Sequence, residues 1–326
     1  MTVKRQHRTV ADLAPLARAA LGRHRTLTAV TRLPGGSKKG VYRLRLDDSS
    51  TAVAYVWAPD EDYWDQPDAD PRDPFSPAGG PDLFTASHDR LAAAGVRTPR
   101  LLHVDRAAGA AVVEDLPGGS LEEALRRDPD AAGKALRRLA EDLRTLRGCR
   151  SAAHGKAALV DAGGTSYGDS CARLVTERAL SDIAATAVRE PRVAAARERL
   201  EETVRALAGA VRPRAGHSLV HGELGPDHVL LDAAGWPALI DIEGLMYFDA
   251  EWEHVFLRLR FGPHYDSLRA PGLDEDRLRL YRLAMHLNLV AGPLRLLDGD
   301  FPRAEFMRGI AEYNLARALA LTASAS

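Results

Sequence analysis

The residues with the clearest chemical potential lie between positions 219 and 243, which read LVHGELGPDHVLLDAAGWPALIDIE. An apolar run ends at His221, and Glu223 follows it. His228 comes five positions after Glu223, and Asp241 comes eighteen positions after Glu223. A carboxylate can accept a proton from an alcohol, while a second carboxylate and an imidazole can hold a metal ion. The segment therefore predicts a general base next to a metal site.

A β-hairpin is expected to position these side chains. Residues 229–231 and 238–240 are apolar and flank the turn signal Ala234-Gly235. His228 and Asp241 bracket the hairpin, and the second strand delivers Asp241.

The first third of the chain has the pattern of a small antiparallel sheet. A helix is predicted over 9–23 from its apolar spacing. Alternating residues then predict three strands with polar or glycine-rich turns between them. A helix at 83–94 and two more strands follow. The five predicted strands cover 29–33, 41–46, 51–57, 99–104 and 110–114.

The pattern changes after residues 114–119. Apart from the hairpin block, helical spacing continues to the end of the sequence. This contrast predicts an α+β fold with two lobes, a small β-rich N-lobe at 1–117 and a larger helical C-lobe at 118–326. The predicted helices of the C-lobe cover 120–127, 130–147, 166–187, 190–210, 249–260, 273–291 and 302–322.

Bulk properties exclude several classes of protein. The chain has 326 residues and a formal net charge of −1, so nothing points to nucleic acid or an anionic membrane as a partner. Cys149 and Cys171 give neither a disulfide framework nor a metal spacing. The N-terminus lacks an apolar signal core, and no stretch of 18 apolar residues occurs. We therefore expect a cytoplasmic protein.

The stretch 58–82 is rich in Asp, Pro and Gly and allows two interpretations. The favoured one is a solvated and partly mobile loop. The alternative is an acidic rim that attracts a cationic substrate. The acidic residues are Asp60, Glu61, Asp62, Asp65, Asp68, Asp70 and Asp73.

The segment 219–243 resembles the catalytic loop of aminoglycoside phosphotransferases and related small-molecule kinases. That loop reads H-G-D-x-x-x-x-N and is followed by I-D-[WFI]-E. Further similarity lies in the glycine-rich turn at 33–36, in the helix end and strand at 91–102, in the hinge at 112–118 and in the acidic helix start at 249–257. The matching loop residues are His221, Gly222, Glu223, His228, Ile240, Asp241 and Glu243.

The resemblance implies a bilobal protein-kinase-like fold, ATP and Mg²⁺ as cofactors, and phosphoryl transfer to a hydroxyl group of a small molecule. It implies Glu223 as the base, with His228 and Asp241 on the metal. An antibiotic or a sugar-like natural product is the implied acceptor, in resistance or biosynthetic protection. The implied nucleotide-binding residues are Gly35, Gly36, Ser37, Lys38, Lys39, Tyr55, Glu114, Asp115 and Leu116.

Three departures from the family pattern matter. Glu223 replaces Asp, and His228 replaces Asn, as in some macrolide kinases. The strand where the family places its phosphate-binding Lys has Tyr55 instead, and the partner Glu is missing from 82–90. Lys38 or Lys39 could supply the missing cation, although both could equally be solvated turn residues.

The missing lysine also motivates a different function, namely a kinase-like protein that binds nucleotide or another ligand without turnover. A protein kinase fits less well, because the helix start at Asp249 comes only eight positions after Asp241, too few for an activation segment. Glu243 and Glu251 are weaker candidates for contact with metal or substrate. The identity of the acceptor, the choice of ATP over GTP and the oligomeric state stay open.

Overall fold

The chain folds into two units, each of which contains a sheet and helices. The structure is a computed structural model that describes residues 5–64, 70–76 and 79–323. The first unit comprises Met1–Pro71, Phe75–Leu146 and Gly225–Leu245, and the second comprises Arg72–Pro74, Arg147–Leu224 and Met246–Ser326. The α+β class is confirmed. The predicted lobe boundary between residues 117 and 118 differs from the boundaries of these two units and stays a prediction.

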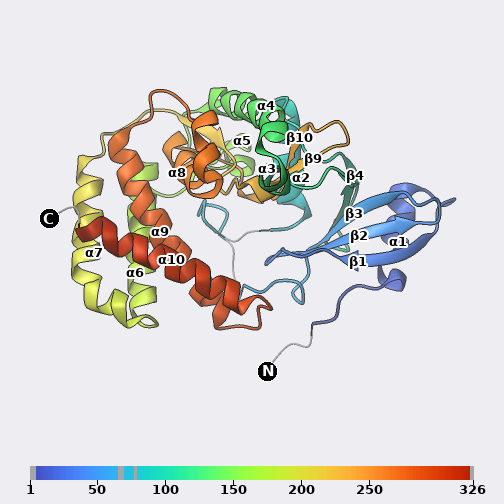
Figure 1. Cartoon of the computed structure of the whole chain (residues 1–326), viewed down its shortest axis with the longest axis horizontal. Helices are drawn as coiled ribbons and strands as arrows, with labels where there is room; N and C mark the ends of the chain where they lie inside the picture. Colours follow the sequence, from blue (N-terminus) through green and yellow to red (C-terminus); the bar gives the residue numbers. More distant parts are fainter. Residues whose placement is uncertain (1–4, 65–69, 77–78, 324–326) are drawn as a thin grey trace. The chain divides into compact units, whose positions relative to one another are not determined.

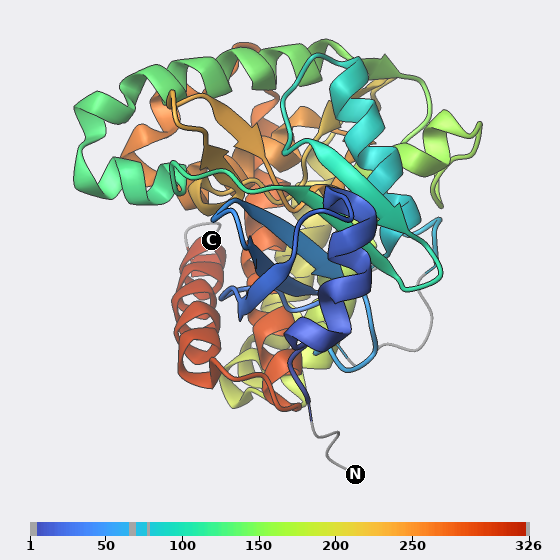
Figure 2. The ribbon, with the colours of Figure 1, turned by 90° about the vertical axis from the view of Figure 1, so that its right-hand side faces the viewer.

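The first unit is built on a five-stranded antiparallel sheet (Figures 1 and 2). Its order is β1-β2-β3-β5-β4. Side chains alternate along β2, so that Tyr42 and Leu44 are fully buried. The sequence predicts all five strands, and the observed bounds are β1 Leu27–Arg32, β2 Gly40–Leu46, β3 Thr51–Val56, β4 Leu101–Asp105 and β5 Ala110–Glu114.

Helix α1 (Val10–Leu21) covers one face of this sheet (Figure 2). Its first turn is stabilised by a capping box, in which Thr9 and Asp12 satisfy each other's backbone N–H groups. Leu13, Leu16 and Ala17 pack with the buried side chains of the strands. The remaining helices of the unit are α2 Pro81–Ala93, α3 Leu121–Arg127 and α4 Pro129–Gly148, whose last two residues belong to the second unit.

The predicted hairpin belongs to the first unit. Strands β9 (Val229–Leu231) and β10 (Pro237–Leu239) pair antiparallel between the 3₁₀ turns η1 (Pro226–His228) and η2 (Ile242–Gly244). The segment that follows β5 pairs with β9: Gly118 donates to the Leu231 carbonyl at 2.9 Å, and Leu231 donates to the Gly119 carbonyl at 2.8 Å. A Cβ at Gly118 would lie 2.5 Å from backbone oxygens of the hairpin, so only glycine fits there.

The second unit contains a small sheet that the sequence pattern does not reveal. Its order is β6-β8-β11-β7, and its strands are two to four residues long, β6 Arg150–Ser151, β7 Gly155–Lys156, β8 His217–Val220 and β11 Met246–Phe248. Alternation cannot be recognised over so few residues. The helices match the predicted ones closely, with the short α5 in addition: α5 Ala157–Asp161, α6 Cys171–Ala187, α7 Pro191–Ala210, α8 Ala250–Phe261, α9 Glu275–Leu297 and α10 Ala304–Ala323, with the 3₁₀ turn η3 Gly262–Ser267.

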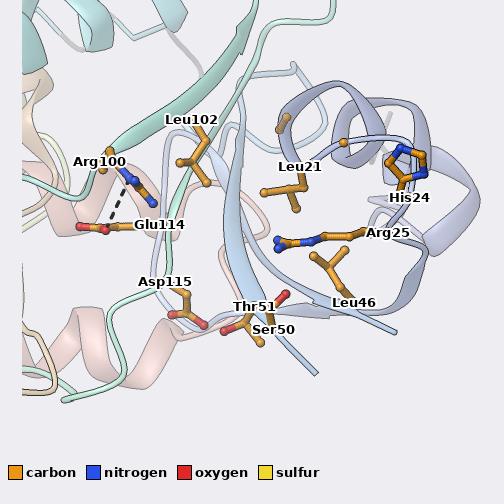
Figure 3. A pocket seen from close by; sticks show the side chains of 12 residues that line it. Leu21, His24, Arg25, Leu46, Ser50, Thr51, Arg100, Leu102, Glu114 and Asp115 are labelled. Atoms are coloured by element: carbon orange, nitrogen blue, oxygen red, sulfur yellow. Dashed lines mark ion pairs between the residues drawn. The ribbon is translucent and has the colours of Figure 1, made fainter. Parts of the chain in front are cut away.

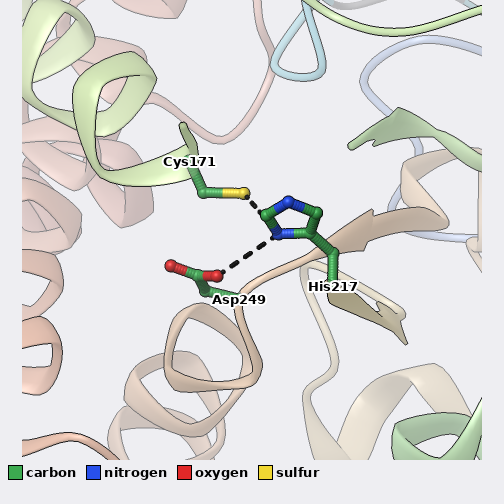
Figure 4. A group of neighbouring side chains, drawn as sticks. All are labelled: Cys171, His217 and Asp249. Atoms are coloured by element: carbon green, nitrogen blue, oxygen red, sulfur yellow. Dashed lines mark hydrogen bonds and ion pairs between the residues drawn. The ribbon is translucent and has the colours of Figure 1, made fainter. Parts of the chain in front are cut away.

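Asp249, at the start of α8, joins several parts of the second unit. It accepts hydrogen bonds from Arg277 Nε at 2.8 Å and from the Tyr281 hydroxyl at 2.6 Å. His217 Nδ1 lies 3.4 Å from its carboxylate and 3.3 Å from Cys171 Sγ (Figure 4). Burial would raise the pKa of Asp249, but these hydrogen bonds and the arginines lower it to about 2. The charge of this buried carboxylate is thus already compensated by Arg277.

The acidic stretch at 58–82 is less solvated than expected. Glu61 is only 2% exposed, and it accepts hydrogen bonds from the Tyr42 hydroxyl and from Arg32. Asp60 pairs with Arg8 at 2.7 Å. Asp65 and Asp68 lie outside the described residues. The interpretation as a solvated loop is therefore wrong for Glu61, which is a buried structural residue.

Two further expectations concern the cysteines and the membrane. Cys149 and Cys171 are both free thiols; Cys171 is buried, whereas Cys149 is intermediate in exposure. Across the described parts of the chain, every helix is too short or too polar to cross a membrane.

Candidate active site

The glycine-rich turn at 34–40 is tightly closed. Leu33 donates to the Val41 carbonyl at 2.8 Å across its base. Gly36 has a φ of +68°, and a Cβ there would lie 2.5 Å from the Lys39 carbonyl oxygen. Ser37 fixes the outside of the turn, because its carbonyl accepts from the Tyr63 N–H and its hydroxyl accepts from Trp64 Nε1, both at 2.8 Å. These contacts fix the backbone of the turn from which the Lys38 and Lys39 side chains extend.

Lys39 reaches from this turn to the end of the hairpin. Its side chain is 9% exposed, and its Nζ donates to Asp241 Oδ1 at 2.9 Å and to Glu243 Oε1. The same ammonium lies 5.3 Å from the centre of the Tyr55 ring. The interpretation of Lys39 as a solvated turn residue is therefore wrong. Lys38 is half-buried and lies 6.0 Å from the Trp64 ring.

The ion pairs fix the charges of these groups. Burial would lower the pKa of Lys39, but the carboxylates of Glu243 and Asp241 outweigh burial and hold that pKa well above its usual value. The Lys39 ammonium in turn holds the pKa of Asp241 far below its usual range. Lys39 and Asp241 are consequently both charged throughout the neutral pH range.

Asp241 has a backbone conformation that is unusual for a residue with a side chain. Its φ of 59° and ψ of 46° lie in the left-handed region, which Asp tolerates better than most residues. Such strained positions cluster at functional sites. The Asp241 side chain is 45% exposed, so its second oxygen is accessible.

His228 precedes the first strand of the hairpin and lies beside Asp241, which follows the second strand. The Ile240 N–H donates to the His228 carbonyl at 3.0 Å, which holds the two strand ends together. His228 Nε2 lies 3.7 Å from Asp241 Oδ2. The hairpin thus brings the two predicted metal ligands to one place, as their spacing suggests.

Glu243, a weaker candidate from the sequence, is a central residue of this cluster. It lies on η2 two positions after Asp241, is 9% exposed and holds Lys39 jointly with Asp241. Its position in the I-D-x-E pattern is the signal that points to it. Glu251, the other weak candidate, lies elsewhere: it forms a two-point ion pair with Arg214 at 2.6 and 2.8 Å inside the second unit.

Tyr55 is part of an aromatic cluster where the family has its ion pair. Its ring packs edge-on against Phe84 of α2, with centroids 5.4 Å apart, and against Trp57 at 6.1 Å. Trp57 also contacts Phe84 at 5.6 Å. Strand β3 and helix α2 are thus joined by aromatic packing.

The side chains of the predicted hinge residues are paired with arginines or buried. Asp115 accepts from Arg43 at 2.6 and 3.1 Å, and Glu114 lies 3.6 Å from Arg97. Leu116 is 6% exposed. Glu114 and Asp115 line a cavity of about 570 Å³ whose other walls come from α1 and the sheet (Figure 3). Any contact of this segment with adenine would therefore use its backbone.

Glu223, the predicted base, lies in the second unit, at an exposed bend that follows β8. The preceding Gly222 has a φ of +92° and donates its N–H to Glu253 Oε2 at 2.9 Å. Glu253 belongs to α8 and is 4% exposed. Burial raises the pKa of Glu253 to about 7, although backbone hydrogen bonds from Gly222 and His221 oppose the shift. Glu253, which sequence reasoning missed, holds the backbone that presents Glu223.

The structure therefore groups most of the predicted site in the first unit. Lys39, Tyr55, His228 and Asp241 lie together there, whereas Glu223 precedes Gly225, the residue at which the chain re-enters that unit. Two carboxylates that already surround a cation form an oxygen-rich donor set, which suits Mg²⁺.

Comparisons with known proteins agree with this geometry. A family model described as the phosphotransferase enzyme family (APH) matches residues 29–286. Choline kinase LicA from Streptococcus pneumoniae superposes with a TM-score of 0.63 at 12% identity, over 96% of this chain and 98% of that one. A choline/ethanolamine kinase family protein from Mesorhizobium loti gives 0.60 at 20% identity, over 96% and 94%.

A third solved structure was determined with ligands. It is a thermostable mutant of aminoglycoside phosphotransferase APH(4)-Ia, in a ternary complex with AMP-PNP and hygromycin B. It superposes with a TM-score of 0.61 at 16% identity, over 93% of this chain and 98% of that one. At these identities the likeness establishes a kinase-like fold. Among curated protein sequences, none is similar enough to count as a match.

Proposed function

The chain belongs to the phosphotransferase enzyme family, and from this premise we propose that it is a small-molecule kinase that uses ATP and Mg²⁺ to phosphorylate a hydroxyl group. The observation that carries the proposal is the carboxylate pair of Asp241 and Glu243 around a cation, with His228 beside it. When bound, Mg²⁺ neutralises charge on the phosphate oxygens. Asp241, His228 and Glu243 are the residues that would hold it.

The remaining residues provide positioning and proton transfer. The acceptor oxygen forms a bond to the γ-phosphorus of ATP, the bond from that phosphorus to the bridging oxygen breaks, and the hydroxyl proton passes to Glu223. Gly35, Gly36 and Ser37 cover the phosphates. Lys39, with Lys38 nearby, supplies the positive charge that β3 lacks.

The nucleotide base is held by the hinge. The backbone of Glu114 to Leu116 provides hydrogen bonds for adenine, because the acidic side chains are engaged with arginines. Tyr55 provides an aromatic surface beneath Lys39. Solved relatives in complex with AMP, ADP and AMP-PNP support ATP as the nucleotide.

The acceptor is proposed to be a hydroxylated natural product, such as an antibiotic or a sugar-like compound. The complex of a structural relative with hygromycin B supports this class, and the choline kinases among the relatives widen it to small amino alcohols. Inactivation of an antibiotic would confer resistance. The cytoplasmic location stays a prediction of the sequence.

A second candidate function is nucleotide binding without turnover. Tyr55 favours it, because the lysine expected on β3 is the usual contact to the phosphates. The location of Lys39 between two acidic groups favours catalysis instead, since a cation is available next to the metal site.

Turnover with a panel of acceptors separates the two functions. The protein is incubated with Mg²⁺-ATP and with aminoglycosides, macrolides and amino alcohols, and a product heavier by one phosphate is sought by mass spectrometry. Asp241→Asn should abolish turnover, and Glu223→Gln should lower kcat by about 10²–10⁴-fold with the ATP KM unchanged. Binding of ATP without turnover of ATP or of any acceptor would favour the second candidate. A fully active Glu223→Gln would refute Glu223 as the base.

A further inference from the structure

Lys39 occupies the place between Asp241 and Glu243 where a metal ion is proposed to bind. We propose that Lys39 is a tethered counter-ion. Without nucleotide, its ammonium blocks the binding of free divalent metal to the carboxylate pair. When metal and nucleotide arrive together, the ammonium moves from the carboxylates to the phosphate oxygens. This inference rests on the proposed function only in assigning the carboxylate pair to the metal.

The first argument is the charge of the carboxylate pair. Asp241 and Glu243 are separated by one residue, and both point at the same Nζ. Glu243 is 9% exposed, so water cannot screen it well. Two adjacent carboxylates in such a place need a cation, and the protein supplies one from its own chain. A metal ion that binds the same oxygens must displace that ammonium.

The second argument is that Lys39 can leave without unfolding its turn. The turn backbone is held by the hydrogen bond between Leu33 and Val41 and by the contacts of Ser37 with Tyr63 and Trp64. Only the four-carbon stem of Lys39 has to change rotamer, and such changes are fast. The Tyr55 ring 5.3 Å away offers a favourable contact for the moving ammonium.

The third argument concerns what the nucleotide adds. The phosphates bring several negative charges to the turn that carries Lys39, so the ammonium gains a new partner when it leaves the carboxylates. Metal without nucleotide offers no such compensation. Metal and nucleotide therefore bind cooperatively, because the phosphates draw Lys39 away from the carboxylates and the metal takes its place there.

The test is a titration of the nucleotide-free protein with Mn²⁺, in which the free ion is measured by electron paramagnetic resonance. Lys39→Met keeps the stem and removes the charge, and it should bind Mn²⁺ about tenfold more tightly than the wild type. Lys39→Gln provides a second neutral variant in case Lys39→Met does not fold. Lys39→Arg keeps the charge and should resemble the wild type. Lys134→Met makes the same substitution at an exposed lysine of α4, outside the proposed site, and as the matched control it should stay within about twofold of the wild type.

The same titration with AMP-PNP separates the two proposals. The wild type should bind Mn²⁺ more tightly with AMP-PNP than without it, and the gain should shrink about tenfold in Lys39→Met. If the neutral variants bind Mn²⁺ no more tightly than the wild type without nucleotide, Lys39 is not a counter-ion that the metal displaces. If Mn²⁺ binding with AMP-PNP is absent, or is unchanged by Asp241→Asn, the proposed metal site itself is wrong.

Discussion

Glu253 is a buried carboxyl group whose partners are backbone N–H groups of the loop before Glu223. Its pKa is raised to about 7 because burial disfavours the charged form. A folded-state pKa above the unfolded value of about 4.5 means that the protonated group stabilises the fold. This contribution is fully present below pH 4.5 and is lost as the pH rises through 7.

The consequence can be measured with Glu253→Gln, which keeps the size and cannot ionise. Between pH 4.5 and 8, the wild type should lose about 3 kcal/mol of unfolding free energy relative to the variant, since one pKa unit corresponds to about 1.4 kcal/mol. Urea unfolding of both proteins at the two pH values gives this double difference. Equal losses in the two proteins would contradict the buried, titrating carboxyl.

At the same scale, the sequence identifies residues more readily than it identifies their partners. His228 and Asp241 are predictable because a hairpin of known spacing joins them. The contact of Lys39 with Asp241 spans 202 positions, and no local pattern links the two residues. Glu253 is also hidden, because an acidic side chain ordinarily faces water.

Among the elements, the junction between the hinge and the hairpin depends on one glycine. A Cβ at Gly118 would lie 2.5 Å from the carbonyl oxygens of Leu231 and Asp232, which are backbone atoms that cannot rotate away. Gly118→Ala should therefore cost about 2–4 kcal/mol of unfolding free energy. Gly309→Ala is the control: its position in α10 has open space, so it should gain up to about 1 kcal/mol. Urea unfolding compares them, and a harmless Gly118→Ala would disprove the tight junction.

Element prediction succeeds where the pattern is long enough to be periodic. The strands β1 to β5 have five to seven residues, and the polar turns between them are visible in the sequence. Strands β6 and β7 have two residues each, and their pairing with β8 and β11 comes from the tertiary fold. Helix ends agree to within a few residues, apart from the start of α6 and the end of α9, because caps such as Ser120 before α3 mark several of them.

At the scale of the whole molecule, the proposed nucleotide site draws on distant segments of one unit. They are the turn at 33–41, the hinge at 112–120 and the hairpin at 226–243. Because a ligand stabilises the segments that it contacts, AMP-PNP with Mg²⁺ should slow amide hydrogen exchange there by up to about 100-fold at 100 times its Kd. Helices α7 and α10 of the second unit serve as the internal control. Protection confined to those helices would place the nucleotide elsewhere.

The family match spans residues 29–286, so the common fold accounts for most of the chain. The kinase-like fold is predictable from the sequence because its catalytic loop and glycine-rich turn keep their spacing. The acceptor is not predictable in the same way, since one fold can serve many different substrates.

The aromatic contact of Tyr55 and Trp57 with Phe84 has a consequence for how helix α2 is held. An ion pair between a strand and a helix weakens as ionic strength rises, because salt screens the charges. Ring packing depends on dispersion and on the release of water, and moderate salt hardly affects it. The orientation of α2 against β3 is therefore expected to be insensitive to salt and to local changes of charge. The helix should keep the same position whichever charged ligands are bound.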